Sequence, residues 1–288
     1  MRKKKKFLVV FTGDLPTKFL GASTVVFYQF IKFILGKDYE LHLLAISTSK
    51  YKKKNIIKFL KSFKNKKIKS FNYFFLKNFF NFNKFNLLIK KIKTSSLSKS
   101  QISKIKKIKP DKILALDITA TSFAKQIFDN KIYVWLGDLN FSTTWYHFYY
   151  KYFNSLAYYI FFLYIKIFVL KWKYFYKNIL SNTNIISGSN ANIKELKKIG
   201  IYSEYQPYPW PKVFKKQKIK KRNKPSYVFF GNLVGLGSKS AFNYLLNEIY
   251  PKYELLWGQD GFNIFVCGSH KIGMNYKKKL KNSKIFIF

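Results

Sequence analysis

The sequence predicts an α/β protein with mainly parallel sheets. In its first half, short apolar runs alternate with longer stretches of helical periodicity, which is the pattern of βαβ units. A second succession of strand, glycine-containing loop and helix begins at Pro225. With 288 residues, of which 48% are hydrophobic, the chain has enough apolar material for two cores. We therefore expect two Rossmann-like domains, the second of them incomplete.

Six apolar runs in the first half are short enough to be buried strands and are separated by helical patterns. These runs are residues 6–11, 40–46, 68–75, 112–116, 131–136 and 184–187. The first helix opens at Gly21-Ala22-Ser23-Thr24, runs to about Leu35 and is closed by Gly36. Further helices are expected at 98–108, after Thr119, and at 190–198.

The segment from His147 to about Leu180 is predicted to be one long helix, rich in aromatic and aliphatic residues. Lys166 interrupts its most apolar part, and a central lysine costs about 2.5 to 3.5 kcal/mol in a membrane span. A spanning helix is therefore not expected. At about 100° per residue, Lys166, Lys173 and Lys177 fall in a narrow arc. Two interpretations are open: a helix in a membrane interface with lysines toward the headgroups, or a core helix whose lysines reach water.

A proline-rich segment followed by a charged one predicts the domain boundary. The sequence YQPYPWP begins at Tyr205, and its prolines exclude a regular helix or a central strand. The charged stretch that follows, 212–224, lacks a core pattern. We expect an N-terminal domain at 1–204, an interdomain linker at 205–224 and a partial C-terminal domain at 225–288.

The second domain is predicted to contain strands at 226–230, 262–266 and 284–288 and a helix at 240–250. It is shorter than the common domain size of about 100 to 150 residues. A parallel sheet that stops at its third strand would leave an open apolar edge. We therefore expect either a fragment or a naturally degenerate protein.

Lysine dominates the charge of the chain. There are 55 basic and 12 acidic residues, a formal net charge of +43, and only Arg2 and Arg222 are arginine. Such a field attracts nucleic acid or an anionic membrane surface, but an AT-rich genome also produces lysine-covered surfaces without a function. Specific nucleic-acid readers rely on arginine, which weighs against nucleic acid. Cys267 is the one cysteine, which excludes an internal disulfide and a cysteine-based zinc site and fits a reducing cytoplasm.

Three glycine-bearing loops follow predicted strands, at 12–21, 231–237 and 268–273. In doubly wound folds, ligands bind at the carboxyl ends of strands, where glycine lets backbone N–H groups approach a phosphate. Each loop taken singly is equally well explained as a strand-to-helix turn, and no G-x-G-x-x-G fingerprint is present. The loops therefore gain meaning only from their arrangement across two domains.

Several segments, taken in order, match one known pattern. PSYVFFGNLVGLGSKSAFNYLLNEIYP starts at Pro225, FNIFVCGS follows it, and IISGSNANIKELKKIGI, KPDKILALD and IYVWLGDLN lie earlier in the chain. The first two resemble the opening and the second strand of the donor-binding domain in GT-B glycosyltransferases of the group 1, family 4 type. The other three are similar to the last and the middle strands of that family's N-terminal domain. The resemblance implies transfer of a sugar from a nucleotide-diphosphate donor, bound mainly by the second domain, to an acceptor held by the first.

The resemblance also implies roles for single residues. The loop at Gly21 would lie near the donor phosphates, Lys239 would neutralise the diphosphate and Gly268 would face the base. The loop that carries Asp138 would line the acceptor side, which makes Asp138 the candidate catalytic residue. The implied donor-binding residues are Gly21, Gly231, Asn232, Lys239 and Gly268.

Two departures from the family put activity in doubt. Asn232 stands where many members carry an arginine, and the family's acidic motif for ribose and sugar hydroxyls has no counterpart in this sequence. No metal cluster and no cofactor are expected, since the nucleotide-sugar is a substrate. Asp138 has an alternative role as a helix cap, and His147 has one as a residue of a helix surface. His42 is expected to be structural. His270 is expected to contact either the donor or water.

The predicted function is that of a glycosyltransferase in polysaccharide biosynthesis, acting on a lipid-linked or polysaccharide acceptor. The predicted partners are a nucleotide-sugar donor, a glycan or lipid-linked acceptor and a membrane surface contacted by residues 147–180, with no specific nucleic acid. We expect a cytoplasmic protein, peripheral on the inner face of the membrane. The alternatives are an inactive, truncated GT-B-like protein and a basic protein that binds membrane surfaces or nucleic acid.

Overall fold

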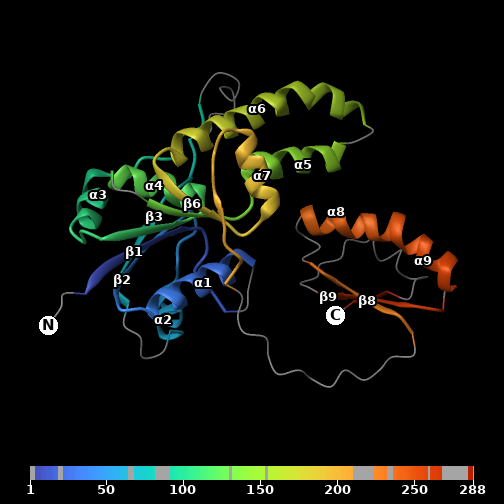
Figure 1. Ribbon diagram of the computed structural model, residues 1–288, viewed down its shortest axis with the longest axis horizontal. Helices are drawn as coiled ribbons and strands as arrows, with labels where there is room; N and C mark the ends of the chain where they lie inside the picture. Colours follow the sequence, from blue (N-terminus) through green and yellow to red (C-terminus); the bar gives the residue numbers. More distant parts are fainter. Residues whose placement is uncertain are drawn as a thin grey trace. The chain divides into compact units, whose positions relative to one another are not determined.

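The computed structural model describes residues 4–18, 22–63, 68–81, 91–129, 132–152, 155–209, 224–231, 236–258, 260–267 and 285–287. The chain forms two compact α/β units (Figure 1). The first comprises residues 1–145 and 156–212, and the second 146–155 and 213–288. Residues 210–223, most of the predicted linker, lie outside the described residues. The predicted domain boundaries therefore stay a prediction.

Seven parallel strands form the sheet of the first unit, in the order β3-β2-β1-β4-β5-β6-β7. The order reverses between β1 and β4, as in a Rossmann fold, which confirms the predicted fold class. The strands are β1 (Lys5–Thr12), β2 (Tyr39–Ser47), β3 (Ile68–Phe75), β4 (Lys112–Leu116), β5 (Ile132–Leu136), β6 (Thr183–Ser187) and β7 (Glu204–Tyr205). The six predicted strands are present to within one residue, and β7 is an additional short edge strand.

Helices cover both faces of this sheet (Figure 1). Along β1, Leu8 and Val10 belong to one buried cluster and Val9 and Phe11 to the other, as the alternation of side chains in a strand requires. The first face is covered by α3 (Lys99–Lys106), α4 (Ile118–Ile127), α6 (Leu156–Leu180) and α7 (Asn190–Lys198). The second face is covered by α1 (Ala22–Leu35) and α2 (Lys53–Lys61). The result is a three-layer unit with two separate cores.

The prediction of one continuous helix from His147 to Leu180 is wrong. The segment instead belongs to two helices, α5 (Asn140–Tyr152) and α6. The end of α5 is satisfied locally, because both the backbone N–H and the hydroxyl of Ser155 donate to the carbonyl oxygen of Tyr152. A serine that bonds the preceding turn competes with continuation of the helix. The helical hydrophobic pattern continues across this break, which is why the sequence did not show it.

Three parallel strands form the sheet of the second unit, in the order β10-β9-β8. They are β8 (Ser226–Phe230), β9 (Asn263–Cys267) and β10 (Ile285–Ile287), and the helical part comprises α8 (Leu236–Tyr244), the π-helical turn η2 (Leu245–Ile249) and α9 (Tyr250–Trp257). The prediction that this helix ends at Tyr250 is wrong. Pro251 lies in the first turn of α9, where a missing N–H costs nothing, so the proline permits a new helix.

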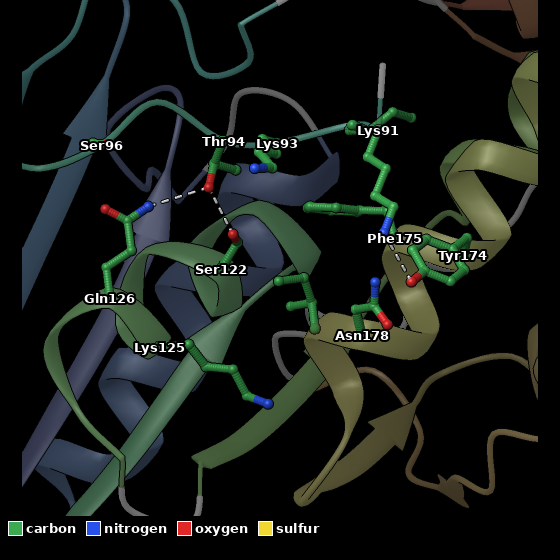
Figure 2. A pocket seen from close by; sticks show the side chains of 12 residues that line it. Lys91, Lys93, Thr94, Ser96, Ser122, Lys125, Gln126, Tyr174, Phe175 and Asn178 are labelled. Atoms are coloured by element: carbon green, nitrogen blue, oxygen red, sulfur yellow. Dashed lines mark hydrogen bonds between the residues drawn. The ribbon is translucent and has the colours of Figure 1, made fainter. Parts of the chain in front are cut away.

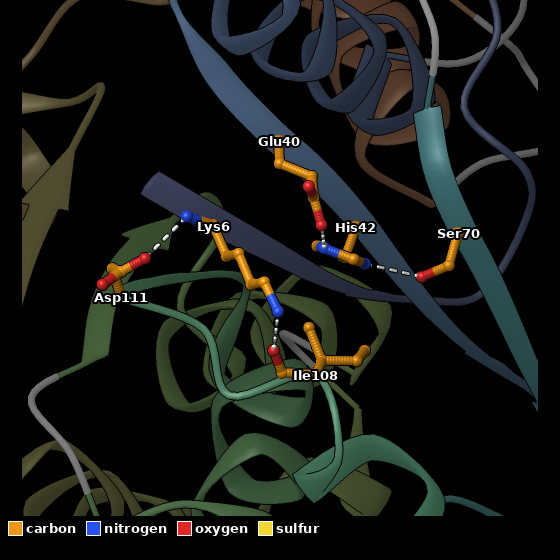
Figure 3. A network of polar contacts seen from close by, with 6 residues as sticks. All are labelled: Lys6, Glu40, His42, Ser70, Ile108 and Asp111. Atoms are coloured by element: carbon orange, nitrogen blue, oxygen red, sulfur yellow. Dashed lines mark hydrogen bonds and ion pairs between the residues drawn. The ribbon is translucent and has the colours of Figure 1, made fainter. Parts of the chain in front are cut away.

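A network of polar contacts lies within the first sheet (Figure 3). The buried ring of His42 contacts the hydroxyl of Ser70 at 2.8 Å through Nδ1 and the carboxylate of Glu40 at 2.9 Å through Nε2. A neutral ring satisfies both partners, with Nε2–H donating to Glu40 and Nδ1 accepting from Ser70. Burial lowers the pKa of His42 below 6.5, although Glu40 opposes this shift. His42 is structural, as the sequence indicated.

This network predicts a pH-dependent contribution to stability. As the pH falls below 6.5, unfolded chains bind a proton on His42 that the folded protein does not, so the free energy of unfolding decreases. We expect His42→Gln to destabilise the protein by about 1 to 3 kcal/mol at pH 8, by loss of buried hydrogen bonds, and by less at pH 5. Urea unfolding at both pH values measures the difference. His147→Gln, at an exposed position of α5, is the control, and an equal deficit for His42→Gln at both pH values would contradict the prediction.

Candidate functional site

The carboxyl ends of β1 and β4 meet where the strand order reverses. Chains that leave such neighbouring strands turn to opposite faces of the sheet, and the crevice between them is where ligands bind in open α/β sheets. Thr12 ends β1, and Asp117 follows β4 as the N-cap of α4. The hydroxyl of Thr12 donates to Asp117 Oδ2 at 2.8 Å, and the backbone N–H of Ala120 donates to Asp117 Oδ1 at 2.6 Å. Asp117 therefore ties the two strand ends together.

Two features of Asp117 cost free energy on folding: the burial of its carboxyl group and the conformation of its backbone. Burial raises the pKa of its carboxyl to about 6, and the hydrogen bonds from Ala120, Thr12 and Thr119 offset only part of this effect. Its backbone has φ 100° and ψ 170°, a conformation that is essentially confined to glycine. No lysine is hydrogen-bonded to its carboxylate within the described residues. A strained backbone and a perturbed carboxyl at a strand end together indicate a functional position.

The turn after β5 carries Asp138, which is exposed to solvent. Two other elements hold this turn. Asn192 of α7 donates from Nδ2 to the carbonyl oxygen of Gly137 at 2.6 Å. The buried hydroxyl of Tyr176 in α6 donates to Asn140 Oδ1 at 2.8 Å and accepts from the Asn140 backbone N–H at 3.1 Å. The backbone on both sides of Asp138 is thus held by hydrogen bonds, while the side chain of Asp138 is exposed to water.

The loops after β6 and β7 lie beside the same turn. The backbone N–H of Gln206 donates to the carbonyl oxygen of Ser187, and a Cβ added at Gly188 would lie 2.7 Å from the ring of Tyr208. Burial raises the pKa of Tyr208, and the charge of Asp138 adds to that shift. The Tyr208 ring also packs edge-on against Trp135, with 5.7 Å between ring centroids. Asp138 and Tyr208 therefore face one region at the carboxyl edge.

On the other side of β1, two tyrosines hold the glycine turn. Gly13 has φ 87° and donates its N–H to the carbonyl oxygen of Ile46. The Tyr51 hydroxyl donates to the carbonyl oxygen of Gly13, and its ring stacks on Tyr73 at 4.5 Å. Burial raises the pKa of Tyr51 to about 12, so this hydroxyl stays a donor at physiological pH.

Only part of the predicted donor site falls on described residues. Gly231 directly follows β8, and its N–H donates to the carbonyl oxygen of Cys267 at 3.1 Å. A Cβ added there would lie 2.7 Å from Ser238 Oγ of α8, so the strand and the helix approach closely. Lys239 is within α8, but its side chain lies outside the described part. Gly21, Asn232, Gly268 and also His270 lie outside the described residues.

Asp117 is the residue that the sequence reasoning missed. It stands between an apolar run and a helical stretch in KILALDITATSFA, and the resemblance included it in the segment KPDKILALD. An aspartate directly after a buried strand is a usable signal, because it falls at the carboxyl edge of a parallel sheet. Its strain and its contact with Thr12 depend on the fold and could not be read from the sequence.

The described residues contain neither a further candidate metal site nor a helix that could span a membrane. Among the residues that the structure describes, no group of three or more histidines, cysteines or carboxylates could hold a metal ion. None of the described helices combines the length and apolarity needed to cross a bilayer.

No family model and no curated protein matches the chain. Among solved structures, it is similar to a glycosyltransferase from Rickettsia africae, with 15% identity, a TM-score of 0.49 and coverage of 100% of this chain and 68% of that one. A sialyltransferase from Photobacterium phosphoreum has 13% identity, a TM-score of 0.45 and coverage of 99% and 81%. TcCGT1 in complex with UDP has 10% identity, a TM-score of 0.42 and coverage of 99% and 72%. The first two names are those of glycosyltransferases, the class of protein that the sequence resembles.

The buried carboxyl of Asp117 predicts a second pH effect, opposite in sign to that of His42. Its folded pKa of about 6 lies above the ordinary 3.8, so its stabilising contribution is complete below pH 3.8 and is lost as the pH rises through 6. At about 1.4 kcal/mol per pKa unit, we expect Asp117→Asn to gain on the order of 3 kcal/mol relative to wild type between pH 4 and pH 7.5. Urea unfolding of both proteins at the two pH values tests this. Asp138→Asn is the matched control at an exposed carboxylate, and parallel profiles for Asp117→Asn and wild type would contradict the prediction.

Proposed function

We propose that the chain transfers a sugar from a nucleotide-diphosphate sugar to a lipid-linked or polysaccharide acceptor. The observation that carries this proposal is the pair of carboxylates, Asp117 and Asp138, at the carboxyl ends of the adjacent strands β4 and β5. They stand beside the switch point of a parallel sheet, where ligands bind in this fold class. The sequence resemblance supplies the reaction class, and the second parallel α/β unit is the kind of unit in which that family binds its donor.

In this proposal Asp138 acts on the acceptor. Its exposed carboxylate accepts the proton of the acceptor hydroxyl while the acceptor oxygen bonds to the anomeric carbon. The bond from that carbon to the diphosphate oxygen breaks, and the nucleoside diphosphate leaves with the electron pair. Asp117 is a positioning residue, because it joins the end of β1 to the first turn of α4.

The donor side of the proposal rests on the sequence resemblance. By that resemblance, Gly231 and Asn232 would open the donor pocket, Lys239 would neutralise the diphosphate, the loop at Gly21 would lie near the donor phosphates and Gly268 would face the base. The absence of a side chain at Gly231 is consistent with this role and also lets Ser238 of α8 pack closely after β8. No metal or cofactor is part of the proposed reaction.

The exposed side of α6 supports an acceptor at a membrane. Apolar side chains lie there at helical spacing, and we call them the apolar stripe: Leu156, Tyr159, Ile160, Leu163, Leu170 and Tyr174. The opposite side of the helix buries Trp172, Phe175 and Tyr176. Lys166 and Lys177 are exposed on the same helix. An exposed apolar stripe with lysines suits the interface of an anionic bilayer, with the lysines toward the headgroups. We propose a cytoplasmic protein bound peripherally to the inner face of the membrane.

Donor binding by the whole chain tests the proposed reaction. We expect ligand-detected NMR to show saturable binding of either UDP or GDP and its sugars, with one nucleotide preferred and with binding retained at moderate salt. A highly basic protein also collects polyanions, but that binding falls steeply with ionic strength, so pyrophosphate is the control ligand. Equal binding of all polyanions that disappears in salt would contradict the proposal and indicate an inactive GT-B-like chain.

Substitution of Asp138 tests its role in the reaction. We expect Asp138→Asn to leave donor affinity unchanged and to lower sugar transfer by about 100-fold or more, the size of a general-base contribution. Transfer is measured with the preferred nucleotide-sugar and membrane extract as acceptor. Asp129→Asn, at an exposed aspartate that precedes β5, is the control. Unchanged transfer by Asp138→Asn would remove Asp138 from the mechanism.

Vesicle binding tests the apolar stripe. We expect Leu163→Glu combined with Leu170→Glu to reduce binding to vesicles that contain phosphatidylglycerol by at least about tenfold, because each glutamate removes apolar contact and adds repulsion. Phe33→Glu combined with Ile57→Glu is the control, since it makes the same charge change at exposed apolar residues of α1 and α2. Equal losses for the two double variants in a flotation assay would show that only net charge drives binding.

A further inference from the structure

A cavity of about 390 Å³ opens between α4, α6 and the segment that precedes α3 (Figure 2). Its walls are Phe175, Ile92 and Ile179 together with polar side chains from all three elements. Three of the lining residues are lysines, Lys91, Lys93 and Lys125, and none of the lining residues is acidic. The cavity therefore combines apolar side chains with positive charge that no lining carboxylate compensates.

The three ammonium groups are available to an anion to different degrees. Lys91 Nζ contacts the hydroxyl of Tyr174 at 3.3 Å and lies over its ring. Lys125 Nζ donates to the carbonyl oxygen of Ser181 at 2.5 Å, and burial lowers its pKa. Among the described residues, the ammonium group of Lys93 has no hydrogen-bond or ion-pair partner, and only its backbone carbonyl accepts a bond, from the N–H of Asn81. A neutral hydroxyl and a carbonyl are weak partners for ammonium groups, and an anionic oxygen is a better one.

The wall that carries Lys91 and Lys93 is held in place from two sides. Gln126 of α4 donates to Thr94 Oγ1 at 3.2 Å and to the carbonyl oxygen of Ser95 at 3.0 Å, and it accepts the N–H of Leu97 at 2.9 Å. Phe80, which pairs with Thr94 in an isolated bridge, packs on Trp172 and Phe175 of α6. The backbone that directly follows Lys93 is thus held in place, which reduces the ordering cost of binding a ligand.

This cavity is separate from the carboxyl-edge site. Asp117 begins α4 at the carboxyl end of β4, whereas Lys125 lies at the other end of α4 and bonds Ser181, just before β6 begins. The cavity therefore opens toward the amino ends of the strands. It does, however, share Tyr174 with the apolar stripe of α6.

We propose that this cavity binds a phosphate group, either of a small phosphorylated molecule or of a lipid headgroup. The phosphate oxygens take the ammonium groups of Lys91 and Lys93 as donors, with Lys125 on the wall that α4 forms. The apolar side chains of the cavity accept the organic part of the ligand. This site is additional to the proposed transferase reaction, since it uses none of the residues assigned to donor or acceptor.

The experiment uses the full chain, labelled with ¹⁵N, and two soluble probes: inorganic phosphate, and dihexanoyl phosphatidic acid below its micelle concentration. We expect saturable shifts of the amide signals of Thr94, Ser96 and Asn178. Lys91→Gln combined with Lys93→Gln should weaken binding by about tenfold for each lysine, the size of a charge-assisted hydrogen bond. Lys104→Gln combined with Lys107→Gln is the control, with the same charge change at exposed positions at the end of α3.

The two probes distinguish the sources of the phosphate. Equal affinity for inorganic phosphate and for the short-chain lipid, lost only in the variant with Lys91→Gln and Lys93→Gln, assigns the site to a free phosphorylated molecule. Tighter binding of the short-chain lipid, lost in the same variant, assigns it to a headgroup. Amide spectra of both variants verify that the fold is intact. Shifts that do not saturate, that spread over surface lysines, or that both double variants weaken equally would overturn the proposal.

Discussion

The burial of β1 between β2 and β4 is the constraint on which the first unit depends. Eight residues of β1 pair with β2 and five with β4, in both cases in parallel. Alternate side chains of this one strand enter both cores, so a shift of register by one residue would exchange the two faces. The same strand delivers Thr12 and Gly13 to the carboxyl edge. The two cores and the candidate site are therefore positioned by a single element.

The carboxyl edge uses carboxylates in two different environments. Asp117 is desolvated and held by a hydroxyl and a backbone N–H, whereas Asp138 stands in water on a turn fixed by Asn192 and Tyr176. Two carboxyl groups in such different surroundings, one buried and one in water, can take separate roles in one reaction. The strain at Asp117 is a stability cost that the surrounding sheet has to offset, which is a common property of functional positions.

The candidate site and the lysine-lined cavity of the first unit lie toward opposite ends of its strands. The acidic groups of the candidate site stand at the carboxyl ends of the strands, while the lysine-lined cavity opens toward their amino ends. Many of the other described lysines lie at exposed positions, as the composition of the chain predicts. In the cavity, by contrast, hydrogen bonds from Gln126 hold the segment that carries two of the lysines. A bound phosphate there and an apolar stripe in a bilayer would anchor the same helix, α6, without using the carboxyl edge.

The sequence by itself determined the α/β class, the six main strands of the first unit and the three of the second, because buried strands of a parallel sheet are short apolar runs between turn residues. It also placed Asp138 and Gly231 at strand ends, although their roles stay predictions. Only the structure showed the end of α5 at Tyr152 and the start of α9 at Tyr250, where a local hydrogen bond and a proline in the first helical turn outweigh the periodic pattern. It also decided the contact of Thr12 with Asp117 and the grouping of Lys91, Lys93 and Lys125. Those contacts join residues about 30 to 100 positions apart, and only the packing of helices onto a sheet brings such residues together.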